Sequence, residues 1–256
     1  MSTAFSPVKK TKRMLRESAN RVLARRGMEI VHQQLERMPA KQLLLALKHF
    51  RIELVLDIGA NVGQFGEELF ANGYAGELVS VEPLPDAHVA LRAAAAKHAR
   101  WTVREPMAAG QDERMVEIAV AGNSYSSSVL EMLDRHIEAA PGSAPIGKIS
   151  VQQKTLDGVF AQQLDRQRPA LLKIDTQGYE LPILEGAPQC LERVSLVLLE
   201  LSLQQLYRGQ KLWLDLIAYM AEKGFEVWSL QPEFCDPKTG QLLQINGLFH
   251  RKHDPS

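Results

Sequence analysis

The stretch that decides the fold is Leu54-Val-Leu-Asp57-Ile-Gly59-Ala-Asn-Val-Gly63-Gln-Phe-Gly66. It predicts a short buried strand over residues 54–58, then a glycine-rich turn and the start of a helix. Glycine after a buried strand lets the backbone turn tightly and lets a ligand approach where a Cβ atom would clash. The spacing of the glycines matches neither the G-x-x-x-x-G-K-[ST] of a phosphate-binding loop nor the G-x-G-x-x-G of a dinucleotide fingerprint.

Acidic residues end the first two predicted strands. Asp57 closes the strand at 54–58, and Glu82 follows the strand at 78–81. A carboxylate at the first strand end repels a pyrophosphate and favours a cation, and S-adenosylmethionine carries an ammonium and a sulfonium but no phosphate. An acid at the second strand end is placed to bind both ribose hydroxyls of a nucleoside. The alternative is that Asp57 caps the next helix and that Glu82 is a solvated turn residue.

We therefore predict that S-adenosylmethionine is the cofactor. Adenine is expected beside the exit of the third strand, at residues 105–108, through packing and backbone contacts. No Asp or Asn stands there at the usual amine-reading position. The predicted cofactor-binding residues are Asp57, Gly59, Asn61, Gly63, Glu82, Pro83, Met107 and Ala108.

Strands and helices alternate along the chain from residue 54. The alternation breaks between about 110 and 155, where short strand pieces are separated by loops rich in Ser, Gly and Pro. This pattern predicts an α/β fold with a doubly wound, Rossmann-like, seven-stranded sheet whose last strand is antiparallel. The Ser/Gly/Pro-rich insertion is expected to be either a substrate lid or a plain connecting loop. The seven sheet strands are predicted at 54–58, 78–81, 101–103, 170–174, 195–201, 225–229 and 247–250, and the strand pieces of the insertion at 115–120, 128–130 and 149–151.

The length and composition fit one sizeable α/β domain with additional segments. The chain has 256 residues, of which 45% are hydrophobic and 23% charged, and its net charge is zero. That balance excludes bulk disorder and a nucleic-acid-binding polycation. No apolar run predicts a membrane span or a signal peptide, and two isolated cysteines favour a reducing cytoplasm. No His, Cys or Asp cluster has the spacing of a metal site.

Residues 1–50 are predicted to be helical N-terminal residues that precede a methyltransferase-type domain at 51–256. Residues 1–26 hold eight bases and one acid, with an apolar stripe at Leu15, Ala19, Val22 and Leu23. One interpretation is a basic amphipathic helix that makes weak contact with the anionic inner face of a membrane. The alternative is a solvated arm, or a helix that docks on the acidic remainder of the same subunit or of a neighbour in a homo-oligomer.

Four segments resemble the FkbM family of S-adenosylmethionine-dependent methyltransferases. They are Asp57–Gly63, Val81-Glu-Pro83, Lys173-Ile-Asp-Thr-Gln-Gly-Tyr-Glu180 and Gly247-Leu-Phe-His250. The resemblance runs from about residue 50 to 250. It implies O-methylation of a hydroxyl on a sugar, glycolipid or secondary metabolite, with no recognisable metal requirement. The family usually shows an acid where this chain has Gln177, so we assign no acid chemistry to that position.

A sugar hydroxyl is a poor nucleophile while it is protonated, so we expect a positioned base. Asp175 follows the fourth strand and Glu200 lies near the end of the fifth; with Glu180 they are the predicted catalytic residues. The alternative for Asp175 is a structural carboxylate that pairs with Lys173 or caps the next helix. In the insertion, Asn123, Ser127 and His136 are predicted to face the acceptor; the alternative is a polar loop and a structural histidine.

Two other functions compete with methyl transfer. An NAD-dependent oxidoreductase of the short-chain type would need an early G-x-x-x-G-x-G and a Tyr-x-x-x-Lys pair, and the glycines at 59–66 do not match the first. A methyltransferase fold that serves only as a binding module would not need an intact site, and the presence of Asp57, the glycines and Glu82 argues against it.

Overall fold

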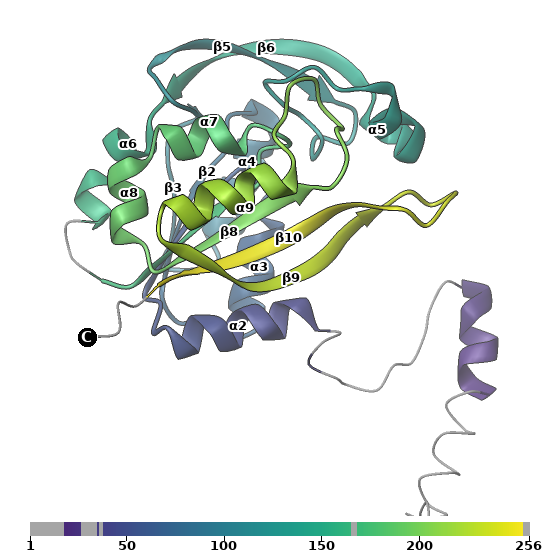
Figure 1. Cartoon of the computed structure of the whole chain (residues 1–256), viewed down its shortest axis with the longest axis horizontal. Helices are drawn as coiled ribbons and strands as arrows, with labels where there is room; N and C mark the ends of the chain where they lie inside the picture. Colours follow the sequence, from purple (N-terminus) through teal and green to yellow (C-terminus); the bar gives the residue numbers. More distant parts are fainter. Residues whose placement is uncertain (1–17, 27–34, 36–37, 165–167, 253–256) are drawn as a thin grey trace, which may run out of the picture. The chain divides into compact units, whose positions relative to one another are not determined.

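The computed structural model describes residues 18–26, 35, 38–164 and 168–252 (Figure 1). The chain divides into two compact units, residues 1–42 and 43–256. In the first unit, residues 18–23 are helical and are followed by the 3-10 turn η1 (Ala24–Arg26). Much of the basic segment at 1–26 lies outside the described residues, so its membrane or docking role stays a prediction. None of the helices in the described ranges has the length and apolar character that a membrane span requires.

The second unit is built on a seven-stranded sheet with the order β3-β2-β1-β7-β8-β10-β9. Neighbouring strands from β3 to β8 are parallel, and β10 is antiparallel to both β8 and β9. The predicted doubly wound sheet with an antiparallel last strand is confirmed. That last strand lies inside the sheet, next to the outermost strand β9. The strands are β1 (Leu54–Ile58), β2 (Glu77–Val81), β3 (Trp101–Val103), β7 (Ala170–Ile174), β8 (Leu196–Ser202), β9 (Phe225–Cys235) and β10 (Leu242–Arg251).

Helices cover both faces of this sheet (Figure 1). Every residue of β1 is buried because its side chains alternate between two cores: Leu54, Leu56 and Ile58 enter one and Val55 enters the other. Such a continuous apolar run is typical of a parallel strand that is covered on both sides. The first core includes residues of α6 (Leu156–Leu164), α7 (Glu180–Glu185), α8 (Pro188–Arg193) and α9 (Trp213–Glu222); the second includes residues of α2 (Pro39–His49), α3 (Gln64–Ala71) and α4 (Pro85–Ala95).

The insertion forms a second, three-stranded sheet, which corrects the expectation of a plain connecting loop; its role as a substrate lid stays a prediction. Its order is β4-β6-β5, with β4 (Ala108–Ala109), β5 (Arg114–Ala121) and β6 (Pro145–Lys154); α5 (Asp134–Ala139) lies between β5 and β6 in the sequence. Apolar residues of β5 and β6 pack against Leu84 and Ala87, which gives the segment a small core of its own. The strand pieces at 115–120 and 149–151 are confirmed, whereas the piece at 128–130 makes only an isolated bridge, from Ser128 to Ala119.

Candidate active site

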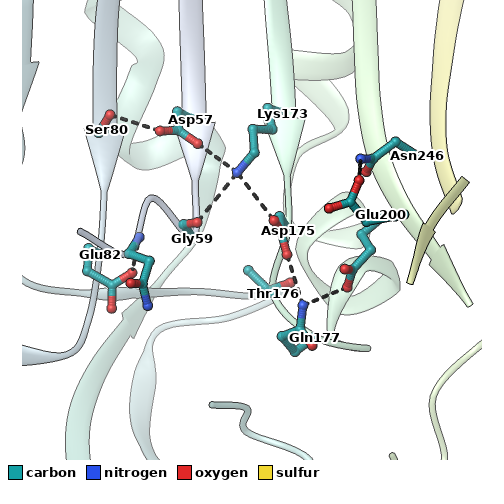
Figure 2. A network of polar contacts seen from close by, with 12 residues as sticks. Asp57, Gly59, Ser80, Glu82, Lys173, Asp175, Thr176, Gln177, Glu200 and Asn246 are labelled. Atoms are coloured by element: carbon teal, nitrogen blue, oxygen red, sulfur yellow. Dashed lines mark hydrogen bonds and ion pairs between the residues drawn. The ribbon is translucent and has the colours of Figure 1, made fainter. Parts of the chain in front are cut away.

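A row of polar side chains crosses the middle of the main sheet near the carboxyl ends of its strands (Figure 2). Asp57 on β1 is in register with Ser80 on β2 and with Lys173 on β7. Lys173 Nζ lies 2.9 Å from one carboxylate oxygen of Asp57, and Ser80 Oγ donates to the other oxygen at 3.1 Å. The Trp101 indole N–H in turn donates to Ser80 Oγ at 3.0 Å. Four neighbouring strands, β3, β2, β1 and β7, are therefore joined by one hydrogen-bonded chain.

The charges of Asp57 and Lys173 compensate each other inside the sheet. The Asp57 side chain is 0% exposed and that of Lys173 is 9% exposed. Burial acts to lower the pKa of Lys173, but the nearby carboxylates of Asp57 and Asp175 raise it, and the net pKa lies above the ordinary lysine value. The ammonium therefore stays charged. Asp57 lies at the strand end as predicted, but it offers no free charge to a ligand, which corrects the argument that its carboxylate attracts a cation directly.

The turn after β1 is fixed to the ends of both neighbouring strands. Gly59 has φ +76°, and a Cβ atom there would lie 1.9 Å from the carbonyl oxygen of Asp175. The amides of Gly59 and Ala60 both donate to the carbonyl of Val81 at 3.1 Å. Gly63, with φ +97°, ends the turn and precedes α3. Only glycine meets the demands at position 59, where the backbone conformation and the available space both exclude a side chain.

Glu82 ties the end of β2 to this turn. It accepts hydrogen bonds from the amides of Asn61 and Leu84, one on each carboxylate oxygen, both at 2.8 Å. The side chain is buried, which contradicts the alternative of a solvated turn residue, and burial raises its pKa to about 7. Each carboxylate oxygen has a second lone pair, so Glu82 retains acceptors for two hydroxyl groups. Pro83, which follows it, is half-buried.

In the segment predicted to lie beside adenine, residues 105 and 106 are exposed, whereas Met107 and Ala108 are buried. Met107 contributes to the core between the main sheet and the helices of its first face, and Ala108 contributes to the small core of the insertion. One ring nitrogen of His88 lies 2.7 Å from the carbonyl oxygen of Arg104 and so holds the segment that leads to these residues. Their contact with a cofactor stays a prediction.

Asp175 is the most accessible acid at the carboxyl end of the central strands. Its side chain is 39% exposed, and its amide donates to the carbonyl of Ile58 at 3.1 Å, so it lies directly beside the turn after β1. One carboxylate oxygen accepts from Gln177 Nε2 at 3.1 Å, and the other lies 3.7 Å from Lys173 Nζ. Asp175 therefore contacts Lys173, as one of the two alternatives expected, and its role as a base stays a prediction.

Glu200 and Glu180 are both buried, with different partners. Glu200 accepts from Gln177 Nε2 at 2.7 Å, and burial together with the charges of Asp175 and Glu180 raises its pKa. One oxygen of Glu180 accepts from the amides of Thr176 and Gly178, each at 3.1 Å. Burial raises the Glu180 pKa to about 7. Glu180 holds the backbone of its own turn, which favours a positioning role over contact with an acceptor.

The three predicted acceptor residues of the insertion make local contacts. Asn123 accepts from the amide of Ser126 at 3.1 Å, and Ser127 Oγ accepts from the amide of Ala121 at 2.9 Å. His136 is buried against Tyr207, with ring centroids 5.2 Å apart, and burial lowers its pKa to about 4. These contacts favour the alternative, a structured polar turn and a neutral core histidine.

Two other serines in the same run connect the insertion to the site, and the sequence analysis did not select them. The Ser124 hydroxyl and the Asn61 side chain are hydrogen-bonded at 3.2 Å, and Ser128 Oγ donates to the carbonyl of Gln177 at 2.8 Å. The sequence offered one signal for these contacts, the run of short polar side chains at residues 123–128. It did not show which of these side chains point towards the main sheet.

Tyr207 and Lys211 have the Tyr-x-x-x-Lys spacing of short-chain oxidoreductases. That pair acts from one face of a helix, where residues four apart are neighbours. Here residues 203–212 are not helical, and the Tyr207 hydroxyl is buried between the carbonyl of Ser126, at 2.8 Å, and Gln177 Oε1, at 3.0 Å. Lys211 is exposed. The spacing therefore does not support an oxidoreductase site.

Fold and site together define a Rossmann-like α/β protein whose glycine turn is flanked by the buried acid Glu82 on one side and the accessible acid Asp175 on the other. Residues 57–227, more than half of the chain, match the family model described as "Methyltransferase FkbM domain". The chain belongs to this family of methyltransferases. No curated protein sequence matches the chain.

Solved structures with a related fold include three whose descriptions name methyltransferases. A putative O-methyltransferase from Klebsiella pneumoniae is 13% identical, with 98% of this chain and 92% of that chain covered and a TM-score of 0.46. Magnesium protoporphyrin IX methyltransferase from Synechocystis PCC 6803 is 12% identical, with 98% and 100% covered and a TM-score of 0.45. A putative RNA methyltransferase from Pyrococcus horikoshii is 15% identical, with 86% and 87% covered and a TM-score of 0.44.

Proposed function

We propose that this chain is an S-adenosylmethionine-dependent O-methyltransferase that acts on a hydroxyl group of a sugar, glycolipid or secondary metabolite. The observation that carries the proposal is the placement of Glu82 and Asp175 at the ends of β2 and β7, on either side of the turn at residues 59–63. Membership of the FkbM methyltransferase family supports methyl transfer. The choice of oxygen and of the acceptor class rests on the sequence resemblance.

The residues present fit the nucleoside part of the proposed cofactor. Glu82 retains lone pairs for the two ribose hydroxyls, and the backbone of the turn at 59–63 is held open by glycine where a side chain would clash. S-adenosylmethionine supplies an electrophilic methyl group when it is bound. Asp175 is placed to accept the proton of the acceptor hydroxyl, and Gln177 and Lys173 hold its carboxylate from two sides.

Cofactor affinity is expected to rise with pH between about 6 and 8. The pKa of Glu82 is about 7 because the side chain is buried, and hydroxyl donors bind the ionised carboxylate best. Glu82 is therefore mostly protonated at the lower end of this range and mostly ionised at the upper end, which corresponds to a change of up to about tenfold in affinity. Calorimetric titration with S-adenosylhomocysteine at several pH values measures it. The Glu82→Gln variant should bind more weakly and lose this dependence; an identical pH profile in the variant would contradict the assignment.

The proposed base is tested by Asp175→Asn. The variant should retain cofactor affinity within a few fold and lose about a hundredfold or more in turnover, as expected for a general base. The assay incubates protein with methyl-labelled S-adenosylmethionine and a panel of free sugars, glycolipids and polyhydroxylated metabolites, and follows label in the acceptor. Asp134→Asn is the matched control, because Asp134 is exposed on α5. Full turnover in Asp175→Asn would show that alignment suffices or that another base acts.

A further inference from the structure

Gln177 bridges the carboxylates of Asp175 and Glu200 (Figure 2). Its side-chain nitrogen is 2.7 Å from a carboxylate oxygen of Glu200 and 3.1 Å from one of Asp175. Its side-chain oxygen accepts from the Tyr207 hydroxyl at 3.0 Å. A primary amide has two N–H donors, so one amide serves both carboxylates. The hydrogen-bonding groups of this side chain are thus engaged at both ends.

The direction of the amide follows from its neighbours. If oxygen and nitrogen were exchanged, the amide oxygen would lie between two carboxylate oxygens, and both contacts would become repulsive. The Tyr207 hydroxyl shares its one proton between the carbonyl oxygen of Ser126, at 2.8 Å, and the amide oxygen of Gln177, at 3.0 Å, and the second contact anchors the far end of the side chain. The nitrogen therefore faces Asp175 and Glu200.

The backbone of Gln177 is held in a conformation that glutamine rarely adopts. Its φ is +56°, a left-handed value that is unfavourable for a residue with a side chain. A contact from another segment stabilises this backbone conformation, because the Gln177 carbonyl accepts a hydrogen bond from Ser128 Oγ at 2.8 Å. Tyr207 also reaches the carbonyl of Ser126 at 2.8 Å. The insertion therefore holds the backbone of Gln177 directly, through Ser128, and its side chain indirectly, through the contact of Tyr207 with Ser126.

We propose that Gln177 is a positioning residue of the methyl-transfer site. Its amide separates the carboxylates of Asp175 and Glu200 and directs Asp175 towards the acceptor, while Ser128 and Tyr207 of the surrounding segments fix the amide. The part of this inference that concerns methyl transfer rests on the proposed function. The family usually shows an acid at position 177. In this chain such an acid would place a third carboxylate between those of Asp175 and Glu200, whereas the amide of Gln177 donates to both.

The charged groups around Glu200 determine how its pKa should respond when the amide of Gln177 is removed. Asp175 and Lys173 face it from β7 and the turn that follows, and Glu180 from α7. From β9, Glu233 adds a further negative charge, and its carboxylate accepts from the Asn246 side chain at 2.7 Å. Burial and these acids raise the pKa of Glu200, and the N–H of Gln177 is the contact that opposes them. Loss of the amide should therefore make Glu200 hold its proton to higher pH.

The test compares Gln177→Leu with Gln162→Leu, which changes an exposed glutamine on α6 in the same way. The carboxyl ¹³C resonance of Glu200 is followed against pH in protein labelled at the glutamate side-chain carboxyl, without cofactor or acceptor. The resonance is identified by its loss in Glu200→Gln. We expect the Glu200 midpoint to rise by about one pH unit, a tenfold change in proton affinity, in Gln177→Leu and to stay in place in the control. An unmoved midpoint in Gln177→Leu would overturn the proposal.

Two further variants keep the inference testable if Gln177→Leu does not fold. Tyr207→Phe retains the amide and removes its anchor, so the Glu200 midpoint should move in the same direction by a smaller amount; no movement would count against the anchor.

Gln177→Glu should shift the acid limb of the methyl-transfer pH profile upwards while the affinity for S-adenosylhomocysteine stays within a few fold. Wild-type protein that transfers no methyl group would overturn the proposed function, whereas an unmoved Glu200 midpoint overturns the role of Gln177.

Discussion

Replacing Lys173 by methionine is expected to lower the free energy of unfolding by about 3–5 kcal/mol, the typical cost of removing one partner from a buried ion pair. Asp57 is 0% exposed and would keep only the hydroxyl of Ser80 as a partner. An uncompensated carboxylate in the centre of the sheet is far more costly than the lost hydrogen bond alone. Urea denaturation monitored by circular dichroism measures the change.

Two controls separate the loss of the buried pair from general effects of the substitution. Lys97→Met removes an exposed ammonium 2.7 Å from Glu67 and should change stability little, because exposed ion pairs contribute little. Combining Lys173→Met with Asp57→Asn removes both buried charges and should restore a large part of the loss. A Lys173→Met protein as stable as the wild type would contradict the pairing of Lys173 with Asp57.

The second large effect is expected for Gly59→Ala, which should weaken binding of S-adenosylhomocysteine by about a hundredfold or more, roughly 2.7 kcal/mol. The new Cβ would lie 1.9 Å from a backbone oxygen of Asp175, which cannot move aside as a flexible side chain could. Relief of the clash would displace the turn at residues 59–63 from the ends of β2 and β7. Calorimetric titration of the folded variant measures the affinity.

Gly73→Ala is the matched control for backbone strain. Gly73 also has a left-handed φ, +88°, but apart from its chain neighbours no atom of the described residues lies within 4 Å of the position that a Cβ would occupy. This variant should lose about 1–2 kcal/mol of stability and retain its cofactor affinity. Equal losses of affinity in the two variants would show that strain, and not the contact with Asp175, determines the effect.

The main sheet could be predicted because its signals are local. A run of apolar residues that ends at a glycine turn identifies β1, and β7 has the same pattern at residues 170–174. The insertion could be predicted only in part. Its strand pieces at 115–120 and 149–151 were identified, but its Ser, Gly and Pro content suggested loops, and the second sheet depends on contacts of β5 and β6 with Leu84 and Ala87, which lie before it in the chain.

The candidate site, like the fold, could be predicted only where its signals are local in the sequence. Glu82 and Asp175 were predictable because the carboxyl ends of parallel strands meet at one edge of the sheet. The partners of Asp57 depend on strand register, and the sequence analysis named Lys173 only as a possible partner of Asp175. The link from Gln177 to Tyr207 and Glu200 joins residues more than twenty positions apart on different elements, and nothing in the local sequence of each indicates the others.

The central claim, that the glycine turn and Glu82 form an S-adenosylmethionine site, is tested most directly by calorimetric titration of the full chain with S-adenosylmethionine, S-adenosylhomocysteine and NAD. Glu82 and the turn predict one site per chain for the first two ligands and no binding of NAD, because the turn lacks the dinucleotide glycine spacing. Preference for NAD, or no binding of any of the three, would contradict the account.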